Sequence, residues 1–133
     1  MSVRRRVALS VDQLREVRAG RFVRVELGAP TSLPDGLRAI SAFVGTAGGR
    51  VVAYANRCQH NPVPLDTVDV VRLPSGVRGA PMADDGAHLV CHSHGALYRP
   101  SDGLCVLGPC YGQRLFPLDV EDTGGDLAIV LRD

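Results

Sequence analysis

Two short blocks of the chain combine thiol and imidazole side chains at spacings that suit metal binding. The first block is Cys58-Gln59-His60, and the second is Cys91-His92-Ser93-His94-Gly95. The 30 residues from 61 to 90 separate them, so the blocks must meet as two distinct loops of the fold. Two thiolates and two imidazoles suit either a tetrahedral structural zinc ion or a [2Fe–2S] cluster with two Cys on one iron and two His on the other.

The pattern C-x-H followed by C-x-x-H-G resembles the Rieske [2Fe–2S] family, over roughly residues 20–131. The resemblance continues in Gly95-Ala96-Leu97-Tyr98, Asp102-Gly103-Leu104-Cys105 and Gly108-Pro109. It implies one Rieske-type domain over 1–133 with antiparallel sheets, and a small inserted cluster-binding subdomain at about 56–98. It also implies one [2Fe–2S] cluster per chain, bound by four ligands: Cys58, His60, Cys91 and His94.

The resemblance also identifies residues that tune the cluster. In high-potential Rieske proteins, a Ser and a Tyr after the second His donate hydrogen bonds to sulfur, and the matching residues here are Ala96 and Tyr98. The disulfide that joins the cluster loops in those proteins is missing, because Val63 and Ser93 occupy its positions. We therefore expect a reduction potential in the lower or middle part of the Rieske range of about −150 to +300 mV. The alternative for Tyr98 is a core-edge position with its hydroxyl in water.

The segment 103–110 resembles the third loop of the family, whose Gly and Pro pack over the cluster. Pro109 is therefore a candidate neighbour of the cluster. We expect Cys105 to be a small buried apolar residue, and a disulfide between Cys105 and Cys110 is the alternative. His92 is expected in the loop near the cluster and His88 on the surface, neither with a catalytic role.

Several strands must position these loops. Period-two alternation and β-branched residues predict strands at 22–27, 37–44, 50–55, 68–73, 88–90, 96–98, 104–107, 115–120 and 127–131. The strand at 50–55 leads directly into Cys58. Turns are expected at 28–36 and 45–49, which are rich in Gly and Pro. Nine or so short strands predict an all-β sandwich or barrel.

Two stretches allow more than one interpretation. Residues 11–17 are amphipathic and fit either a short helix or an extended arm that leads into the first strand. Residues 66–86 form an insertion rich in Pro and Gly. This insertion either covers part of the cluster or contacts a partner, or it is a tolerated surface excursion.

Composition excludes several classes of protein. A chain of 133 residues with 45% hydrophobic and 22% charged residues is typical of one soluble globular domain. The net charge of +1 predicts no nucleic-acid partner. The apolar run after Arg4-Arg5-Arg6 is too short for an export signal, and no run approaches a membrane span. We therefore expect a cytoplasmic protein with no membrane partner.

The number and positions of the histidines argue against a complete oxygenase. After His60 and His94 are assigned to the cluster, only His88 and His92 remain, and both are close to the cluster region. The chain also has no length for the second domain that holds the 2-His-1-carboxylate iron of a complete Rieske oxygenase. By its resemblance to Rieske-type ferredoxins, the chain is expected to carry single electrons from a reductase to an oxygenase or other redox acceptor, without catalysing a reaction itself. One alternative is a small Rieske subunit of a multi-subunit oxidoreductase, such as a nitrite-reductase-type complex. Another is a zinc-stabilised binding module.

Overall fold

The computed structural model describes residues 4–58, 64–65, 71–91 and 95–132. The predicted all-β, antiparallel class is confirmed, with one helix added to it. Within the described ranges the elements are β1 (Arg4–Ala8), α1 (Val11–Arg18), β2 (Val23–Ser32), β3 (Arg38–Ala47), β4 (Arg50–Ala55), β5 (Val71–Arg72), β6 (Arg78–Gly79), β7 (Leu89–Val90), β8 (Leu97–Tyr98), β9 (Cys105–Leu107), β10 (Pro117–Asp122) and β11 (Leu127–Arg132).

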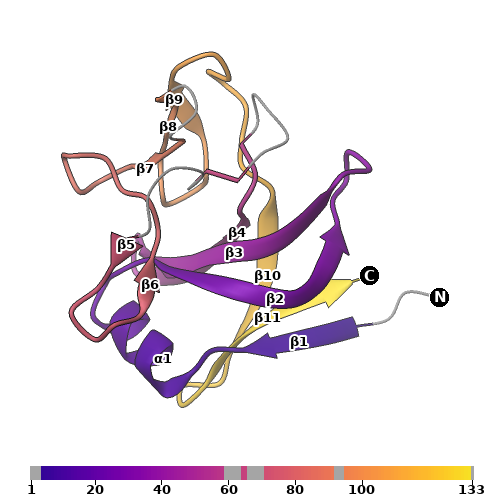
Figure 1. Cartoon of the computed structure of the whole chain (residues 1–133), viewed down its shortest axis with the longest axis vertical. Coiled ribbons are helices and arrows are strands. Elements are labelled where there is room, and N and C mark those ends of the chain that lie inside the picture. Colours follow the sequence, from indigo (N-terminus) through magenta and orange to yellow (C-terminus); the bar gives the residue numbers. More distant parts are fainter. Residues whose placement is uncertain (1–3, 59–63, 66–70, 92–94, 133) are drawn as a thin grey trace.

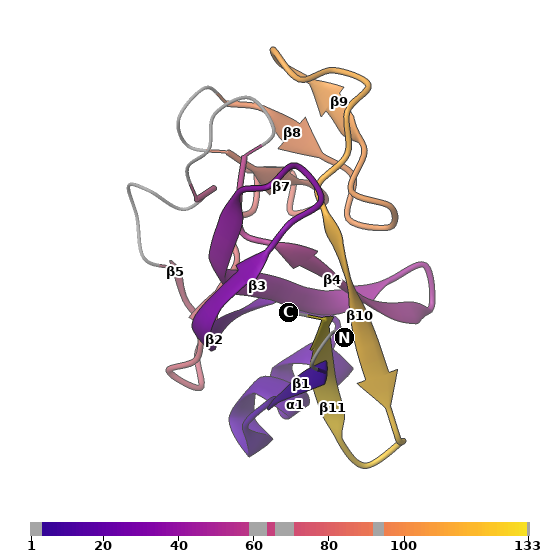
Figure 2. The ribbon, with the colours of Figure 1, turned by 90° about the vertical axis from the view of Figure 1, so that its right-hand side faces the viewer.

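The strands form a large sheet and a small one. The large sheet has eight strands in the order β1-β11-β10-β4-β3-β2-β6-β5, and the small sheet has three in the order β7-β8-β9. Figures 1 and 2 show, from perpendicular directions, the small sheet at one end of the molecule and α1 at the other. The small sheet lies between β6 and β10 in the sequence, so the chain leaves the large sheet to build it and then returns.

The segment 11–17 is a helix rather than an extended arm, because it has a complete N-terminal cap. Ser10 Oγ accepts a hydrogen bond from the Gln13 backbone N–H at 3.1 Å, and Gln13 Oε1 accepts one from the Ser10 N–H at 2.8 Å. Val17 is fully buried on the side of the helix that faces the sheet. No helix within the described ranges is both long and apolar enough to cross a bilayer.

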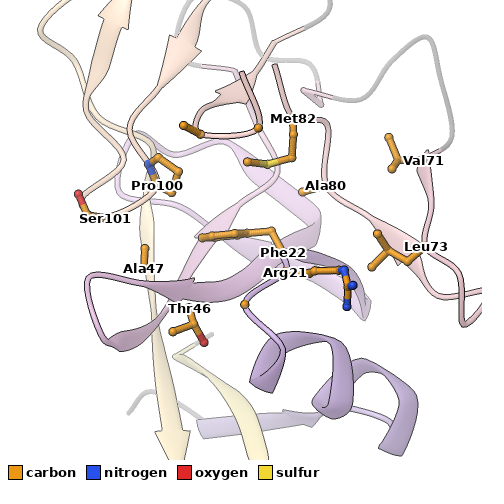
Figure 3. A pocket seen from close by; sticks show the side chains of 13 residues that line it. Arg21, Phe22, Thr46, Ala47, Val71, Leu73, Ala80, Met82, Pro100 and Ser101 are labelled. Atoms are coloured by element: carbon orange, nitrogen blue, oxygen red, sulfur yellow. The ribbon is translucent and has the colours of Figure 1, made fainter. Parts of the chain in front are cut away.

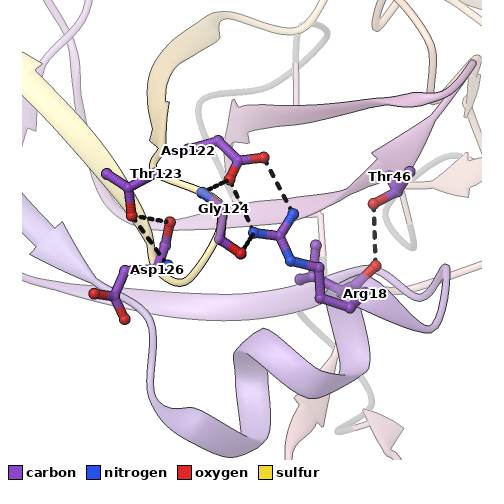
Figure 4. Close-up of polar contacts among 7 residues, drawn as sticks. Arg18, Thr46, Asp122, Thr123, Gly124 and Asp126 are labelled. Carbon is purple, nitrogen blue, oxygen red and sulfur yellow. Dashed lines mark hydrogen bonds and ion pairs between the residues drawn. The ribbon is translucent and has the colours of Figure 1, made fainter.

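Polar contacts hold the end of α1 against the large sheet (Figure 4). The Arg18 guanidinium donates to both carboxylate oxygens of Asp122, at 2.8 and 3.1 Å, and to Gly124 O at 3.3 Å. Thr46 Oγ1 donates to Val17 O at 3.0 Å. The pKa of Asp122 is lowered to about 2, mainly by the hydrogen bond from Arg18. The helix is therefore fixed to both β3 and the β10–β11 turn.

One strand was missed from the sequence, and the predicted turn at 28–36 was wrong. β1 was not expected; it pairs with β11, and the Arg5 side chain donates to Ala29 O at 2.9 Å. β2 continues into the predicted turn at 28–36 as far as Ser32, because an irregularity in register between Glu26 and Thr31 accommodates Gly28 and Pro30 without ending the strand. The turn itself is shorter and closes where Leu33 N donates to Leu37 O at 2.8 Å.

The described part of the insertion, residues 71–86, belongs partly to the large sheet. β5 pairs with β6, and β6 pairs with β2 through Val23 and Gly79. The short strand predicted at 68–73 is found at 71–72, while 66–70 lie outside the described residues. The insertion therefore extends one edge of the large sheet with two short strands.

The core has two main parts. One lies on the large sheet under α1 and contains Val17, Val25, Val44 and Ile129. The other lies toward the small sheet, and its buried residues are Phe22, Phe43, Tyr54, Cys58, Leu65, Ala80, Leu89, Cys91, Ala96, Tyr98, Cys105, Cys110 and Leu115. All four cysteines of the chain belong to this second part.

Candidate metal centre

The structure brings the two predicted cysteine ligands into one buried cluster of side chains. Cys58 lies three residues after β4, and Cys91 directly follows β7. Both side chains are fully buried, and both contribute to the core beside the small sheet. The predicted ligands His60 and His94 lie outside the described residues, as does His92.

Asn56 fixes both ends of the first loop. Its Oδ1 accepts a hydrogen bond from the Leu65 N–H at 2.8 Å, and its Nδ2 donates to Ser41 Oγ at 3.0 Å. Its backbone N–H also donates to Ser41 O at 2.9 Å. The entry to the loop and its exit at Leu65 are thereby held to β3, and Cys58 lies just inside the entry.

The second loop closes on itself around Cys91. The Cys91 N–H donates to Ala96 O at 2.9 Å, and the Gly95 N–H donates to Cys91 O at 2.8 Å. Gly95 has a φ of +72°, in the left-handed region that side chains rarely adopt. The glycine that follows His94 in the sequence pattern therefore has a geometric reason: it allows the chain to turn back into β8.

The third loop packs against the second. A Cβ atom added to Gly108 would lie 2.9 Å from Ala96 Cα, and Gly108 has a φ of +112°. A side chain at this position would therefore push the two loops apart. The neighbouring Pro109 is exposed, and its contact with the cluster stays a prediction.

The Tyr98 hydroxyl lies between two sulfur atoms. Tyr98 Oη is 3.7 Å from Cys58 Sγ and 3.0 Å from Cys110 Sγ. The residue is fully buried, so the alternative of a hydroxyl in water is wrong. The aromatic ring fills the core beneath β8, and this packing carries the hydroxyl group to Cys58.

Cys105 and Cys110 are thiols in contact rather than a disulfide. Their Sγ atoms are 2.9 Å apart, and both residues are buried. Burial is the main cause that raises the pKa of Cys105 to about 12, so this side chain is a protonated thiol at neutral pH. The expected role of Cys105 as a small buried residue fits this environment.

His88 has a partner away from the thiols. Its Nδ1 lies 2.7 Å from Asp85 Oδ2, on the exposed turn before β7. The pKa of Asp85 is lowered, first by the hydrogen bond from the Ala87 N–H and then by His88. His88 therefore occupies the surface position that was expected for it.

Sequence reasoning missed Arg57, which immediately precedes Cys58. Its side chain is buried, forms an ion pair with Asp35, and lies over the Phe116 ring at 5.1 Å from the ring centroid. The hydrogen bond from Arg57 is the main cause that lowers the pKa of Asp35. The Arg57 guanidinium is thus paired with the Asp35 carboxylate, and its contact with Phe116 places it against a part of the core other than the one that contains Cys58. Its position next to Cys58 was the available signal, but one arginine in a loop is weak evidence.

A separate cavity of about 500 Å³ lies between the large sheet and the described part of the insertion (Figure 3). Phe22, Leu73, Met82 and Pro100 line its apolar part, and Arg21 lies at its side. Neither Cys58 nor Cys91 lines it. This cavity is therefore distinct from the candidate metal centre.

The part of the candidate centre that the structure describes, Cys58, Cys91 and their surroundings, fits an iron–sulfur cluster. Two buried thiols share one core cluster, and a hydroxyl group lies near one of them. Two loops are closed by backbone and Asn56 hydrogen bonds, which hold the backbone near both cysteines. When bound, a [2Fe–2S] cluster with Cys and His ligands supplies reversible one-electron redox chemistry.

Solved structures of low sequence identity share this fold. One is a chain in a complex of reduced oxygenase and oxidized ferredoxin in carbazole 1,9a-dioxygenase, with 20% identity, a TM-score of 0.56, and coverage of 96% of this chain and 92% of that one. Another is the ferredoxin of carbazole 1,9a-dioxygenase from Nocardioides aromaticivorans IC177, with 21% identity, a TM-score of 0.50, and coverage of 97% and 96%.

A third similar chain belongs to a reduced complex between oxygenase and ferredoxin in carbazole 1,9a-dioxygenase. It is 21% identical, with a TM-score of 0.50, and the match covers 88% of this chain but 30% of that longer chain. Among curated proteins, no significant match was found. At these identities the solved structures show a shared fold.

The family assignment rests on the amino-acid sequence. The family model of the Rieske [2Fe-2S] domain matches residues 8–122, which is most of the chain and includes both ligand blocks and all three loops. The resemblance seen in the two Cys-His blocks is thus confirmed over β2 to β10. The chain belongs to the Rieske [2Fe-2S] domain family, and its cofactor is a [2Fe–2S] cluster.

Proposed function

We propose that this protein is a one-electron carrier whose cluster is bound by Cys58, His60, Cys91 and His94. The observation that carries the proposal is the burial of Cys58 and Cys91 in one core cluster, at the ends of two closed loops. The protein takes an electron from a reductase and passes it to an oxygenase or another redox acceptor.

The similar solved structures support this choice of partner. Two of them are complexes between an oxygenase and a ferredoxin of carbazole 1,9a-dioxygenase, and a third is a ferredoxin of such a system. We propose the same class of partner for this chain, in the cytoplasm, where thiols stay reduced before a cluster is assembled. The compact unit is a single domain with a cluster-binding subdomain at about 56–98, and β9 pairs with that subdomain through β8.

The third loop is our proposed contact for the partner. Leu107 and Tyr111 are large apolar side chains that are 58% and 75% exposed, on the loop that packs over the second loop. Electron-transfer encounters are small and transient, so two such side chains are a suitable apolar centre.

The ligand set is tested by replacing each histidine in turn. His60→Ala and His94→Ala should each abolish the visible absorption and the electron paramagnetic resonance (EPR) signal of the reduced cluster, and reduce iron to well below two per chain. His88→Ala and His92→Ala are the matched controls and should keep both signals. Loss of the cluster in His92→Ala with retention in His94→Ala would move the ligand assignment to His92.

The cysteine ligands are tested in the same way. Cys58→Ser and Cys91→Ser should lose the cluster and much of the stability, because metal binding and folding are coupled. Cys105→Ser is the control, since it is a buried cysteine in the same core that is not assigned as a ligand. An iron-free Cys105→Ser protein would show that the ligand assignment is wrong.

A further inference from the structure

The Tyr98 hydroxyl has two sulfur neighbours but one proton to donate. Cys110 Sγ lies at 3.0 Å from Tyr98 Oη, and Cys58 Sγ lies at 3.7 Å. All three side chains are buried. Of these two sulfur atoms, Cys110 Sγ is the nearer acceptor for the hydroxyl proton.

The thiol of Cys110 already donates its own proton elsewhere. Cys105 Sγ donates to Leu107 O at 3.3 Å, and Cys110 Sγ donates to Cys105 Sγ at 2.9 Å. With its proton so placed, Cys110 is an acceptor toward Tyr98. The hydrogen bonds run from Tyr98 to Cys110, on to Cys105 and to Leu107 O, which leads away from Cys58.

The backbone holds the two thiols in this position. The Cys105 N–H donates to Gln113 O at 2.7 Å, and the Gly112 N–H donates to Cys105 O at 3.0 Å. The Gln113 N–H donates to Cys110 O at 2.9 Å. Cys105 and Cys110 therefore face each other across one closed loop, and their contact is part of the fold.

We propose that the Cys105–Cys110 thiol pair lowers the reduction potential of the cluster by holding the Tyr98 proton away from Cys58. The inference rests on the proposed role of Cys58 as a ligand. A cysteine bound to iron has no proton and accepts hydrogen bonds, so Cys58 and Cys110 compete for one donor. A hydrogen bond to a ligand sulfur stabilises the reduced, more negative cluster and raises its potential. Cys110 is thus a positioning residue for Tyr98.

The test is an EPR-monitored redox titration of the cluster-loaded protein and three variants: Cys110→Ala, Tyr98→Phe and the double variant. Cys110→Ala removes the competing acceptor, so its potential should shift upward from the wild-type value. The double variant should show no upward shift relative to Tyr98→Phe, because the gain requires the hydroxyl group. A potential that is unchanged or lower in Cys110→Ala, or a rise that persists without the hydroxyl, would overturn the proposal.

Two further variants separate this effect from a general disturbance of the core. Tyr54→Phe is the matched control, because Tyr54 is also buried and its hydroxyl donates to Pro100 O at 2.6 Å, away from the sulfur atoms. It should leave the potential unchanged. Cys105→Ala removes the acceptor of the Cys110 proton, which can then turn to Tyr98 Oη and release the hydroxyl proton to Cys58. It should also raise the potential, and an unchanged value would contradict the proposal even if Cys110→Ala failed to fold.

The outcome is independent of the partner. The potential is read from the loaded protein alone, so it does not require that the proposed acceptor be correct. If the potential responds as expected but no oxygenase accepts the electron, the partner assignment fails and the thiol-pair proposal stands. If the acceptor assay succeeds and the potentials do not respond, the reverse holds.

Discussion

Asn56 is the residue that joins the candidate centre to the large sheet. Its side chain accepts a hydrogen bond from the Leu65 N–H and donates one to Ser41 Oγ, and the residue is almost fully buried. When a buried polar group loses its hydrogen-bond partner, the loss of folding free energy is larger than the net stability that the bond contributed. The position of Cys58 therefore depends on an amide group that takes no part in ligation.

We expect Asn56→Ala to lower the free energy of unfolding by about 1–3 kcal/mol, because it leaves the buried Leu65 N–H without this acceptor. Chemical denaturation followed by circular dichroism measures the change. Ser41→Ala is the control: it keeps the bond to Leu65 and should cost less. Equal losses in the two variants would show that the Leu65 contact is not the important one.

At the residue scale, the sequence predicted what depends on chemical type and spacing. Cys58 and Cys91 were assigned from the two blocks, and Tyr98 was named as a neighbour. Asn56 and Arg57 were not assigned, because their contacts depend on which segments meet in space. Cys105 and Cys110 are close in sequence, and their pairing was considered only as a disulfide, whereas the structure has two thiols in contact. A thiol, an amide or a guanidinium in a loop has no distinctive spacing until the fold brings its partner near.

At the scale of elements, the packing of the third loop on the second depends on a missing side chain. Gly108 and Gly112 lie in the same loop, and both have positive φ values, of +112° and +87°. A Cβ on Gly108 would strike Ala96, whereas a Cβ on Gly112 would meet open space within 4 Å. An alanine at either position would be strained by the positive φ, but only an alanine at position 108 would also overlap a neighbour. Comparing the two substitutions therefore distinguishes backbone strain from steric overlap.

Gly108→Ala should therefore destabilise the protein more than Gly112→Ala. The left-handed conformation costs each alanine roughly 1–2 kcal/mol, and Gly108→Ala adds the displacement of Ala96 beside the second loop. Thermal unfolding gives the stability, and the visible absorption reports cluster retention. Similar losses in both variants would contradict the close contact between the two loops.

The ion pair between Arg18 and Asp122 at the end of α1 should make the stability of the protein depend on pH. The folded-state pKa of Asp122 is lowered to about 2 by Arg18, below the ordinary unfolded value near 4. The ion pair therefore stabilises the fold above about pH 4, and this contribution is lost as pH falls toward 2. Asp122→Asn should destabilise the protein at pH 7 and have a smaller effect at pH 3, as measured by chemical denaturation.

Asp119→Asn is the matched control for this pair. It lies on the same strand, β10, and its partner Arg132 is 3.5 Å away, with both side chains more than half exposed. Exposed ion pairs contribute little, so this variant should have a small effect at either pH. A pH-independent effect of Asp122→Asn would contradict the lowered pKa.

The sequence predicted elements well where local patterns decide. The strand at 50–55 was found with the same bounds, because its apolar run ends at the first ligand loop. β1 was missed because three consecutive arginines do not alternate in polarity, and its pairing with β11 is a contact between the two ends of the described chain. The helix was left open because the Ser10–Gln13 cap is a single local signal in a short segment.

At the scale of the whole molecule, a small sheet lies beside a large one, and the four buried cysteines lie in the core cluster that both sheets contribute to. The small sheet lies at the end away from α1 (Figures 1 and 2). Among large apolar side chains, Leu107 and Tyr111 are exposed on the third loop, and Ile40 is exposed on the large sheet.

Tyr111→Ser should slow electron transfer to the oxygenase component by several-fold and leave the reduction potential unchanged, because it removes an apolar contact from the encounter. Stopped-flow absorption of the reduced protein mixed with the acceptor, purified from the same cells, measures the rate. Ile40→Ser removes a comparably exposed side chain, 54% against 75%, from the large sheet and should have no effect. Equal rates for all three proteins would show that the third loop is not the contact surface.

The most direct test of the central claim is an EPR-monitored redox titration of protein purified without air, together with its iron content. We expect two irons per chain and a single reversible one-electron step with a Rieske-type signal in the reduced state. The midpoint should lie in the lower or middle part of about −150 to +300 mV. A colourless zinc protein, or a cluster that cannot be reduced and reoxidised by one electron, would contradict the central claim.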